Sequence, residues 1–230
     1  GPLGNFIVPI MIGARDMAFP RLNALSFWLL FAAVPPLVAS LFMGGIRDGW
    51  TVYEPLSAQA PIGAVGYQIT IITFAFSTGI ASVNLITTAV TMRARGMSWN
   101  RTPIFVIGII ASSIMGLIWF PMFQYSQILA LSDRIISTAF YNPVMGGSVW
   151  LYENLFWLLG HPEVYVLILP ALGVTCDILP AFTRKPLFSY RLSVWSLVAV
   201  GVLSMIVWGH HMFVSGMSPF TGEYFSLMTL

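Results

Sequence analysis

The sequence predicts an all-α integral membrane helical bundle with about five transmembrane helices. Hydrophobic residues make up 57% of the 230 residues and charged residues only 8%, and the mean hydropathy is +0.84. These values are typical of a chain embedded in lipid and exclude an ordinary soluble domain. A spanning helix needs about 20 mostly apolar residues, and several stretches of the chain reach that length.

The predicted spans follow one another in a single transmembrane region, residues 1–230, and no linker indicates a second domain. Several contain Pro or Gly, which neighbouring helices tolerate inside a membrane. The net charge of +2 is too small to indicate a nucleic-acid partner. From the hydrophobic stretches we expect spans at about 23–45, 64–92, 103–131, 147–176 and 190–216.

Basic residues predict the orientation of these spans. They concentrate in the stretch before the first span and in alternate loops, and only Arg47 and Arg134 fall on the opposite side. Cytoplasmic loops carry an excess of Lys and Arg, so we expect the N-terminus on the cytoplasmic or matrix side. The concentrated set is Arg15, Arg21, Arg93, Arg95, Arg101, Arg184, Lys185 and Arg191.

All three histidines of the chain, His161, His210 and His211, fall inside predicted spans. A single buried histidine is usually a hydrogen-bonded core residue, but three with none left for the loops favour a metal site. Neighbours on a helix point about 100° apart, so His210 and His211 can share an ion only if it lies to one side. Imidazole suits copper, zinc or iron. Zinc hydrolysis deep in a membrane lacks water, whereas redox copper acting on a small apolar gas does not need it.

The stretch "FWLLGHPEVYVLILP", residues 156–170, carries unusual polarity for a membrane span. His161 and Tyr165 are four residues apart and share a helical face, which places a phenol beside the expected metal ligand. Glu163 points about 200° round from His161 and offers a carboxyl for proton traffic. Pro162 removes a backbone donor and loosens the helix. The alternative is that Glu163 packs in its protonated form and Tyr165 is an ordinary aromatic residue.

Five motifs, in order, resemble the catalytic subunit I of haem–copper oxygen reductases of the cytochrome c oxidase type. They are "MIGARDMAFPRLNALSFWLL", "GWTVYEPL", "FSTGIASVNLITT", "LFWLLGHPEVY" and "WGHHMF". The resemblance extends along the whole chain and implies its third to seventh helices, a central fragment of a larger twelve-helix-type subunit. It implies that the three histidines bind copper (copper B) opposite a high-spin haem. It also implies that Tyr165 is covalently joined to His161 and that Trp157 lies beside the site.

The resemblance also implies a proton channel that leads toward Glu163. Asp16 corresponds to the cytoplasmic mouth of that channel. Hydroxyl and amide side chains can both donate and accept hydrogen bonds, as a water-filled route requires. The alternative is that Asn23 and Ser26 are residues at a helix start and that Asp16 is a solvated loop charge. The remaining channel positions are Asn5, Asn23, Asn84, Ser26, Ser77 and Thr78.

No histidine is left to serve as a haem axial ligand, because the resemblance assigns all three to copper. The ligands of the low-spin and high-spin haems, for which haem a is favoured, are therefore expected outside this segment. The lysine of a second proton channel would also fall beyond Leu230. Cys176 departs from the serine that this second channel often has.

The function implied by the resemblance is that of a terminal oxidase subunit, which reduces dioxygen to water and couples the reaction to proton translocation. Its expected partners are the rest of subunit I, oxidase subunits II and III, cytochrome c or quinol as electron donor, dioxygen and membrane lipid. We expect it in the bacterial plasma membrane or the mitochondrial inner membrane. The alternatives are a nitric oxide reductase of the same superfamily and a metal-binding membrane transporter.

Overall fold

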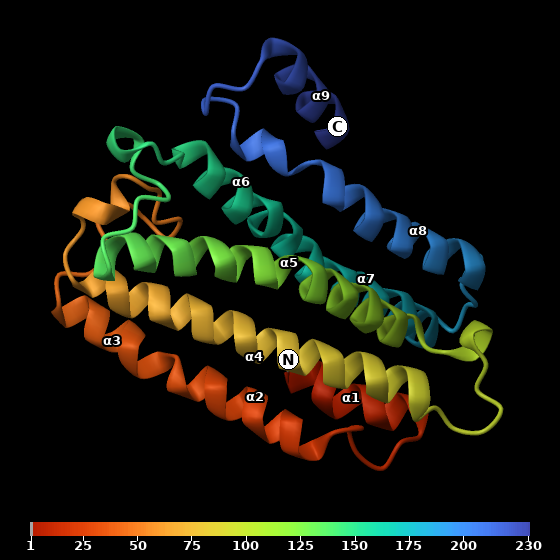
Figure 1. Ribbon diagram of the computed structural model, residues 1–230. Coiled ribbons are helices and arrows are strands. Elements are labelled where there is room, and N and C mark those ends of the chain that lie inside the picture. The colour runs from red at the N-terminus through yellow and green to blue at the C-terminus, as the bar shows by residue number, and fades with distance from the viewer. Residues whose placement is uncertain (1) are drawn as a thin grey trace.

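A computed structural model of the chain describes residues 2–230 as a row of long helices (Figure 1). Every regular element in this described part is helical, which confirms the predicted all-α membrane bundle. The long helices lie beside one another, with α5 between α4 and α7. The long helices are α2 (Pro20–Ala32) with α3 (Val34–Phe42), α4 (Gly63–Thr91), α5 (Ile104–Ile135), and α6 (Val149–Gly160) with α7 (Pro162–Thr183).

Four helical stretches in residues 2–230 are long and apolar enough to cross a membrane. They match the first four predicted spans within a few residues at most ends, although the fourth continues to Thr183, beyond the expected 176. Two of them contain a junction between consecutive helices. The stretches are Pro20–Phe42, Gly63–Thr91, Ile104–Ile135 and Val149–Thr183.

The fifth predicted span, 190–216, is not a continuous helix. Helix α8 (Tyr190–Leu203) gives way to the 3₁₀ turns η4 (Ser204–Ile206) and η5 (Trp208–His211). The backbone of Gly209 lies against the ring of Phe225, so close that a Cβ atom there would clash with it. An apolar sequence indicates an apolar environment but does not require a regular helix. Hydropathy alone therefore predicted a helix longer than α8.

Several shorter elements complete the described chain and were not anticipated. Helix α1 (Pro2–Ile12) lies against α4, and helix α9 (Pro219–Thr229) lies against η5. Three further 3₁₀ turns occur in the connections: η1 (Ser57–Gln59), η2 (Trp99–Arg101) and η3 (Pro143–Met145).

A close crossing of α5 and α7 holds the centre of the row together. A Cβ atom on Gly108 of α5 would lie 2.6 Å from the carbonyl oxygen of Leu169, and one on Gly173 of α7 would lie 2.7 Å from Cα of Phe105. Neither distance is possible for a real side chain, so glycine at both positions lets the two backbones approach. Membrane helices associate through such small residues, because lipid gives no hydrophobic force between them.

The connections carrying most of the basic residues gather at one end of the row. Figure 1 shows the α1–α2, α4–α5 and α7–α8 connections together at that end. We call it the basic end and call the opposite end, with the α3–α4 and α5–α6 connections, the acidic end, because it holds Asp48, Glu54 and Asp133.

Asp177 of α7 closes the free N-terminus of α5. Its Oδ1 accepts a hydrogen bond from the Ile104 amide at 3.1 Å, and its Oδ2 accepts one from the Phe105 amide at 2.9 Å. These amides belong to the first turn, which has no helical partner of its own. A carboxylate there also complements the positive end of the helix dipole.

We predict that Asp177→Ala lowers the free energy of unfolding by on the order of 2 kcal/mol, because two amide groups lose their acceptor. The measurement is the thermal unfolding midpoint of the assembled membrane protein. Asp177→Asn keeps one carbonyl acceptor and should lose less. Equal unfolding midpoints for Asp177→Ala and the unmodified protein would show that water caps α5 equally well.

Candidate functional site

His161 lies at the junction between α6 and α7. Its amide donates to the Trp157 carbonyl at 3.2 Å, and its own carbonyl accepts from the Val164 amide at 3.2 Å. Pro162 has no N–H to continue the regular ladder, so α6 ends and α7 begins here. The His161 side chain is 7% exposed. The junction therefore holds an ionisable side chain in the interior of an apolar span.

His210 and His211 belong to η5, the 3₁₀ turn after α8. In such a turn consecutive residues point about 120° apart, more widely than the helix expected from the sequence. Their ring centroids are nevertheless 4.3 Å apart, and the centroid of His161 lies 4.3 Å from that of His210 and 5.4 Å from that of His211. The structure thus brings together three rings that come from two distant segments.

One nitrogen atom from each of the three rings lies close to the other two. His161 Nδ1 and His211 Nε2 are 3.2 Å apart, and one potential ligand atom from each of the three histidines lies within 4.8 Å of the others. His161 Nε2 is buried and has no hydrogen-bond partner among the described residues. This donor set fits a first-row metal ion that prefers imidazole, such as copper, zinc or iron.

Thr229 of α9 fixes the tautomer of His210. The Thr229 hydroxyl donates to the Phe225 carbonyl at 2.6 Å, and the same oxygen lies 3.1 Å from His210 Nδ1. Because that hydroxyl hydrogen is already used, His210 Nδ1 must carry the proton and donate it. Nε2 of His210 then keeps a lone pair for a metal, as expected when a second hydrogen bond orients a ligating histidine. Nothing in the sequence pattern pointed to Thr229.

Trp157 covers the histidine cluster from α6. Its ring is stacked on His211 with a centroid separation of 3.8 Å and an interplanar angle of 7°. Its indole N–H donates to the Tyr53 hydroxyl in the α3–α4 connection. Burial raises the pKa of Tyr53, which keeps that phenol neutral. The stacked, hydrogen-bonded indole restricts the orientation of His211.

Tyr165 lies beside His161, one turn further along α7. The two ring centroids are 5.0 Å apart with an interplanar angle of 59°. Tyr165 is partly buried and packs with the residues where α5, α7 and α8 meet. The phenol is therefore placed next to the His161 ring, whose Nδ1 lies near His211 Nε2.

Glu163 lines a cavity of about 960 Å³ whose lining includes none of the three histidines. Five of the predicted channel residues line the same cavity: Asn5, Asn23, Ser26, Ser77 and Thr78. The side-chain carbonyl oxygens of Asn5 and Asn23 are buried without a partner in the described chain. Buried polar atoms of this kind are normally satisfied by ordered water. The cavity can therefore hold water between these amides and Glu163.

Three hydroxyl groups of the cavity wall donate their hydrogen to backbone carbonyl oxygens. Ser26 donates to Asn23 at 2.8 Å, Ser77 to Ser26 at 2.6 Å and Thr78 to Phe74 at 3.0 Å. Each hydroxyl oxygen keeps lone pairs that can accept from water. The wall is thus suited to receive hydrogen bonds from a water chain.

Two predicted channel residues do not line this cavity. Asn84 holds the start of α2, because its Oδ1 accepts from the Phe19 amide at 2.9 Å and its Nδ2 donates to the Phe19 carbonyl at 3.2 Å. Asp16 is exposed in the α1–α2 connection at the basic end, and its Oδ1 accepts from the amide of Met17 at 2.7 Å. Asn84 therefore joins α4 to the backbone at the start of α2, and Asp16 is exposed and is not part of the cavity lining.

Three serines of the cavity wall were not predicted from the sequence. They are Ser82 on α4 and Ser112 and Ser113 on α5. The Ser112 hydroxyl donates to the Ile109 carbonyl at 3.0 Å. Ser113 is 4% exposed and lies further along α5 from Gly108, toward the first turn of α7 that carries Glu163. For Ser112 and Ser113, the available signal was the pair of adjacent serines in "ASSI" within an apolar span.

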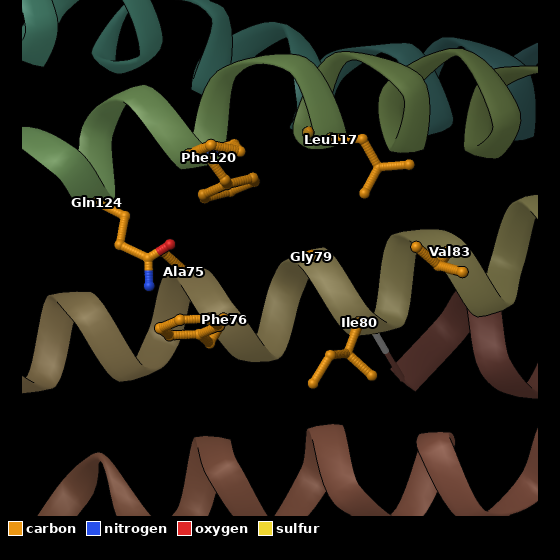
Figure 2. A pocket seen from close by; sticks show the side chains of 10 residues that line it. Ala75, Phe76, Gly79, Ile80, Val83, Leu117, Phe120 and Gln124 are labelled. Atoms are coloured by element: carbon orange, nitrogen blue, oxygen red, sulfur yellow. The ribbon is translucent and has the colours of Figure 1, made fainter.

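A second hollow, of about 270 Å³, lies between α4 and α5 and differs in character. Figure 2 shows Phe76, Ile80 and Val83 of α4 across from Leu117 and Phe120 of α5, with Gln124 as a polar group in the view. The Gln124 amide donates to the Ile72 carbonyl at 3.4 Å. Because its lining offers no titratable group, this hollow does not contribute to the candidate site.

Comparisons with known proteins agree with these features. Residues 1–230 match the family described as Cytochrome C and Quinol oxidase polypeptide I. The chain is 43% identical to cytochrome c oxidase subunit 1 of Thermostichus vulcanus over 231 residues, and 42% identical to cytochrome c oxidase subunit 1 of Bacillus subtilis over 234 residues. It is also 38% identical to an alternative cytochrome c oxidase subunit 1 of Bradyrhizobium diazoefficiens over 247 residues.

These alignments cover nearly the whole chain but only part of each relative. They include 100%, 99% and 100% of the chain and 42%, 37% and 42% of the relatives from Thermostichus, Bacillus and Bradyrhizobium, respectively. The match over all 230 residues extends through both helical segments that supply the histidines. The chain belongs to the cytochrome c and quinol oxidase polypeptide I family and is a fragment of subunit I.

Proposed function

We propose that this chain is the copper-binding part of a terminal oxidase subunit that reduces dioxygen to water and couples this reaction to proton translocation. The observation that carries the proposal is the cluster of His161, His210 and His211, with Tyr165 beside His161 and Trp157 stacked on His211. When bound, copper with a nearby haem would supply the electron transfer and the binding of dioxygen that such a reaction needs. The haem ligands are expected outside this segment.

In this proposal the three imidazoles hold copper and the surrounding residues keep them in place. Thr229 orients His210, and the stacked ring of Trp157 orients His211. His161 is fixed by its position at the α6–α7 junction. Ligands held in this way lose little conformational entropy on binding the metal.

Tyr165 would deliver a hydrogen atom, as a proton together with an electron, to the reacting oxygen. Its ring lies against that of His161, and the buried Nε2 of His161 has no other partner among residues 2–230. A covalent link between these two rings would hold the phenol beside the metal ligand. An aliphatic or phenylalanine side chain at the same place could not release a proton.

Glu163 would pass protons from the cavity toward the metal centre. A donor must lie within hydrogen-bond reach of its acceptor or be joined to it through water. The cavity that Glu163 lines contains the unpartnered carbonyl oxygens of Asn5 and Asn23, so water there could carry protons along the wall. Asp16, exposed at the basic end, would collect protons from solution.

The basic end would face the cytoplasm or the mitochondrial matrix, as the positive-inside rule implies. The multi-pass fold and the family membership support a bacterial plasma membrane or mitochondrial inner membrane location. The remainder of subunit I, subunits II and III and a cytochrome c or quinol donor would complete the enzyme.

The family resemblance also leaves nitric oxide reduction as an alternative, and the presence of Tyr165 and the placement of Glu163 in a cavity favour oxygen reduction over it. A metal-binding transporter is the alternative from another class. A transporter needs no haem, so an absorption spectrum of the assembled complex with Soret and alpha bands would exclude it.

The first prediction for this site concerns metal binding. Replacing His161, His210 or His211 by Ala removes one of the three nitrogen donors, and the copper-to-haem ratio of the purified oxidase should fall by one copper per complex. Metal analysis with a pyridine-haem spectrum measures this ratio. A control is Thr175→Ala, because the Thr175 hydroxyl only donates to the Ala171 carbonyl. Unchanged copper in all three histidine variants would contradict the assignment.

The second prediction concerns Tyr165→Phe, which keeps the ring but removes the phenol. Copper and haem content should remain normal, while oxygen uptake should fall by more than tenfold because the proton and electron donor is lost. Tyr125→Phe, which changes an exposed tyrosine of α5, is the matched control. Normal oxygen uptake by Tyr165→Phe would contradict this role and show that Tyr165 only packs against its neighbours.

The third prediction concerns the proton route. Asp16→Asn removes the collecting charge and should slow turnover and abolish most proton pumping, measured as acidification outside oxidase-containing vesicles. Glu163→Gln keeps a hydrogen-bonding side chain but releases no proton, so the oxygen reaction should stop before completion. Glu223→Gln, in an exposed position on α9, serves as the control. Pumping by Asp16→Asn at the unmodified efficiency would exclude this route but leave the copper assignment intact.

A further inference from the structure

The acidic end of the bundle contains a buried glutamate that the proposed reaction does not use. Glu54 lies in the α3–α4 connection and is 4% exposed. Its Oε2 accepts a hydrogen bond from the Ala58 amide at 3.0 Å. This is the one hydrogen bond that the described residues make to the carboxyl group. A single neutral donor does not compensate an ionised carboxylate for the loss of water.

The nearby cation does not pair with Glu54. Arg134 of α5 donates to the carbonyl of Ala60 at 2.9 Å, to that of Pro61 at 3.3 Å, and to that of Ser57. The two terminal nitrogens of its guanidinium therefore donate to the backbone of the α3–α4 connection. No salt bridge to Glu54 is formed within residues 2–230.

The neighbouring carboxylate of Asp133 differs in this respect. It accepts from the Thr138 hydroxyl at 2.6 Å, from the Phe140 amide at 2.9 Å and from the Tyr141 amide at 2.8 Å. Asp133 is thus well supplied with hydrogen-bond donors, and its charge raises the pKa of the nearby Glu54.

Several polar atoms around Glu54 are buried and lack partners in the described chain. Both carboxylate oxygens of Asp48 are among them, as are the hydroxyl of Ser57 and Nε of Arg134. The Ser57 side chain is fully buried. Ser57 is three residues after Glu54 and is the first residue of η1. Native proteins normally satisfy such groups with water. Water at this place would connect Glu54 to Asp48.

Burial, more than the surrounding charges, favours the protonated form of the Glu54 carboxyl. Burial raises the pKa of Glu54 to about 7, and the Ala58 hydrogen bond and Arg134 oppose this shift, whereas Asp133 and Asp48 add to it. Two phenols also face it, Tyr141 and Tyr152. Burial raises the pKa of Tyr141, so this phenol stays neutral, and the Tyr152 hydroxyl donates to the Thr51 carbonyl at 2.7 Å.

We propose that Glu54 is a proton-binding site at the acidic end, which takes up and releases a proton through water held by Asp48 and Ser57. The site lies at the end of the bundle opposite Asp16 and the basic connections (Figure 1). It needs no metal, and it does not depend on oxygen reduction. The fold thus contains two carboxyl groups of this kind. Glu163 lines the cavity within the bundle, and Glu54 is buried at the acidic end.

The test is an infrared titration of the intact oxidase complex. A protonated carboxyl gives a C=O stretching band that disappears on ionisation. In the unmodified protein this band should contain a component that is lost as the pH rises through about 7. Glu54→Gln should lack that component, and Glu223→Gln, on exposed α9, should keep it. Persistence of the component in Glu54→Gln would overturn the proposal.

A second variant tests the site even if Glu54→Gln does not assemble. Asp48→Asn removes a neighbouring negative charge with little change of shape. Because that charge raises the pKa of Glu54, the midpoint of the same band should move to lower pH. An unchanged midpoint, or a Glu54 that is ionised at every pH because a cation occupies the site, would overturn the proposal.

Discussion

The candidate metal centre depends on the interruption of one long membrane span at His161 and Pro162. Because Pro162 cannot donate to the preceding turn, α6 and α7 meet at a junction. Trp157 lies one turn before His161 and stacks on His211, and Tyr165 lies one turn after His161 beside its ring. Glu163 then points to the separate cavity. A regular helix could carry the same residues, but its backbone hydrogen bonds would fix the angle between the two halves.

The sequence was sufficient to predict the elements that depend on hydrophobic length and side-chain period. The first four spans were predicted to within a few residues, apart from the longer end of α7, and the four-residue spacing of His161 and Tyr165 placed their rings side by side. The turn η5 was not predictable in this way. It forms because Gly209 admits the Phe225 ring and Thr229 holds His210, and both partners lie beyond the apolar stretch. Such contacts between distant residues leave no periodic signal.

Polar residues inside the bundle separate into two kinds that sequence alone does not distinguish. The amide of Asn84 exchanges two hydrogen bonds with the backbone of Phe19, so it braces a helix start. The carbonyl oxygens of Asn5 and Asn23 have no partner in the described chain and line the cavity with Glu163. All three asparagines were predicted to belong to one channel. Only the pairing of each side-chain atom shows which of them can hold water.

The same distinction applies to the acidic side chains. Asp177 and Asp133 accept two and three hydrogen bonds, respectively, from the described residues, and both fasten one backbone segment to another. Glu54 accepts one, from Ala58, and Glu163 accepts none from residues 2–230 while it lines a cavity. A carboxylate that accepts several hydrogen bonds is stabilised in its ionised form, whereas a buried carboxyl with few donors favours its protonated form. The number of donors therefore separates Asp177 and Asp133, which fasten backbone segments, from Glu54 and Glu163, which have one donor and none in the described chain.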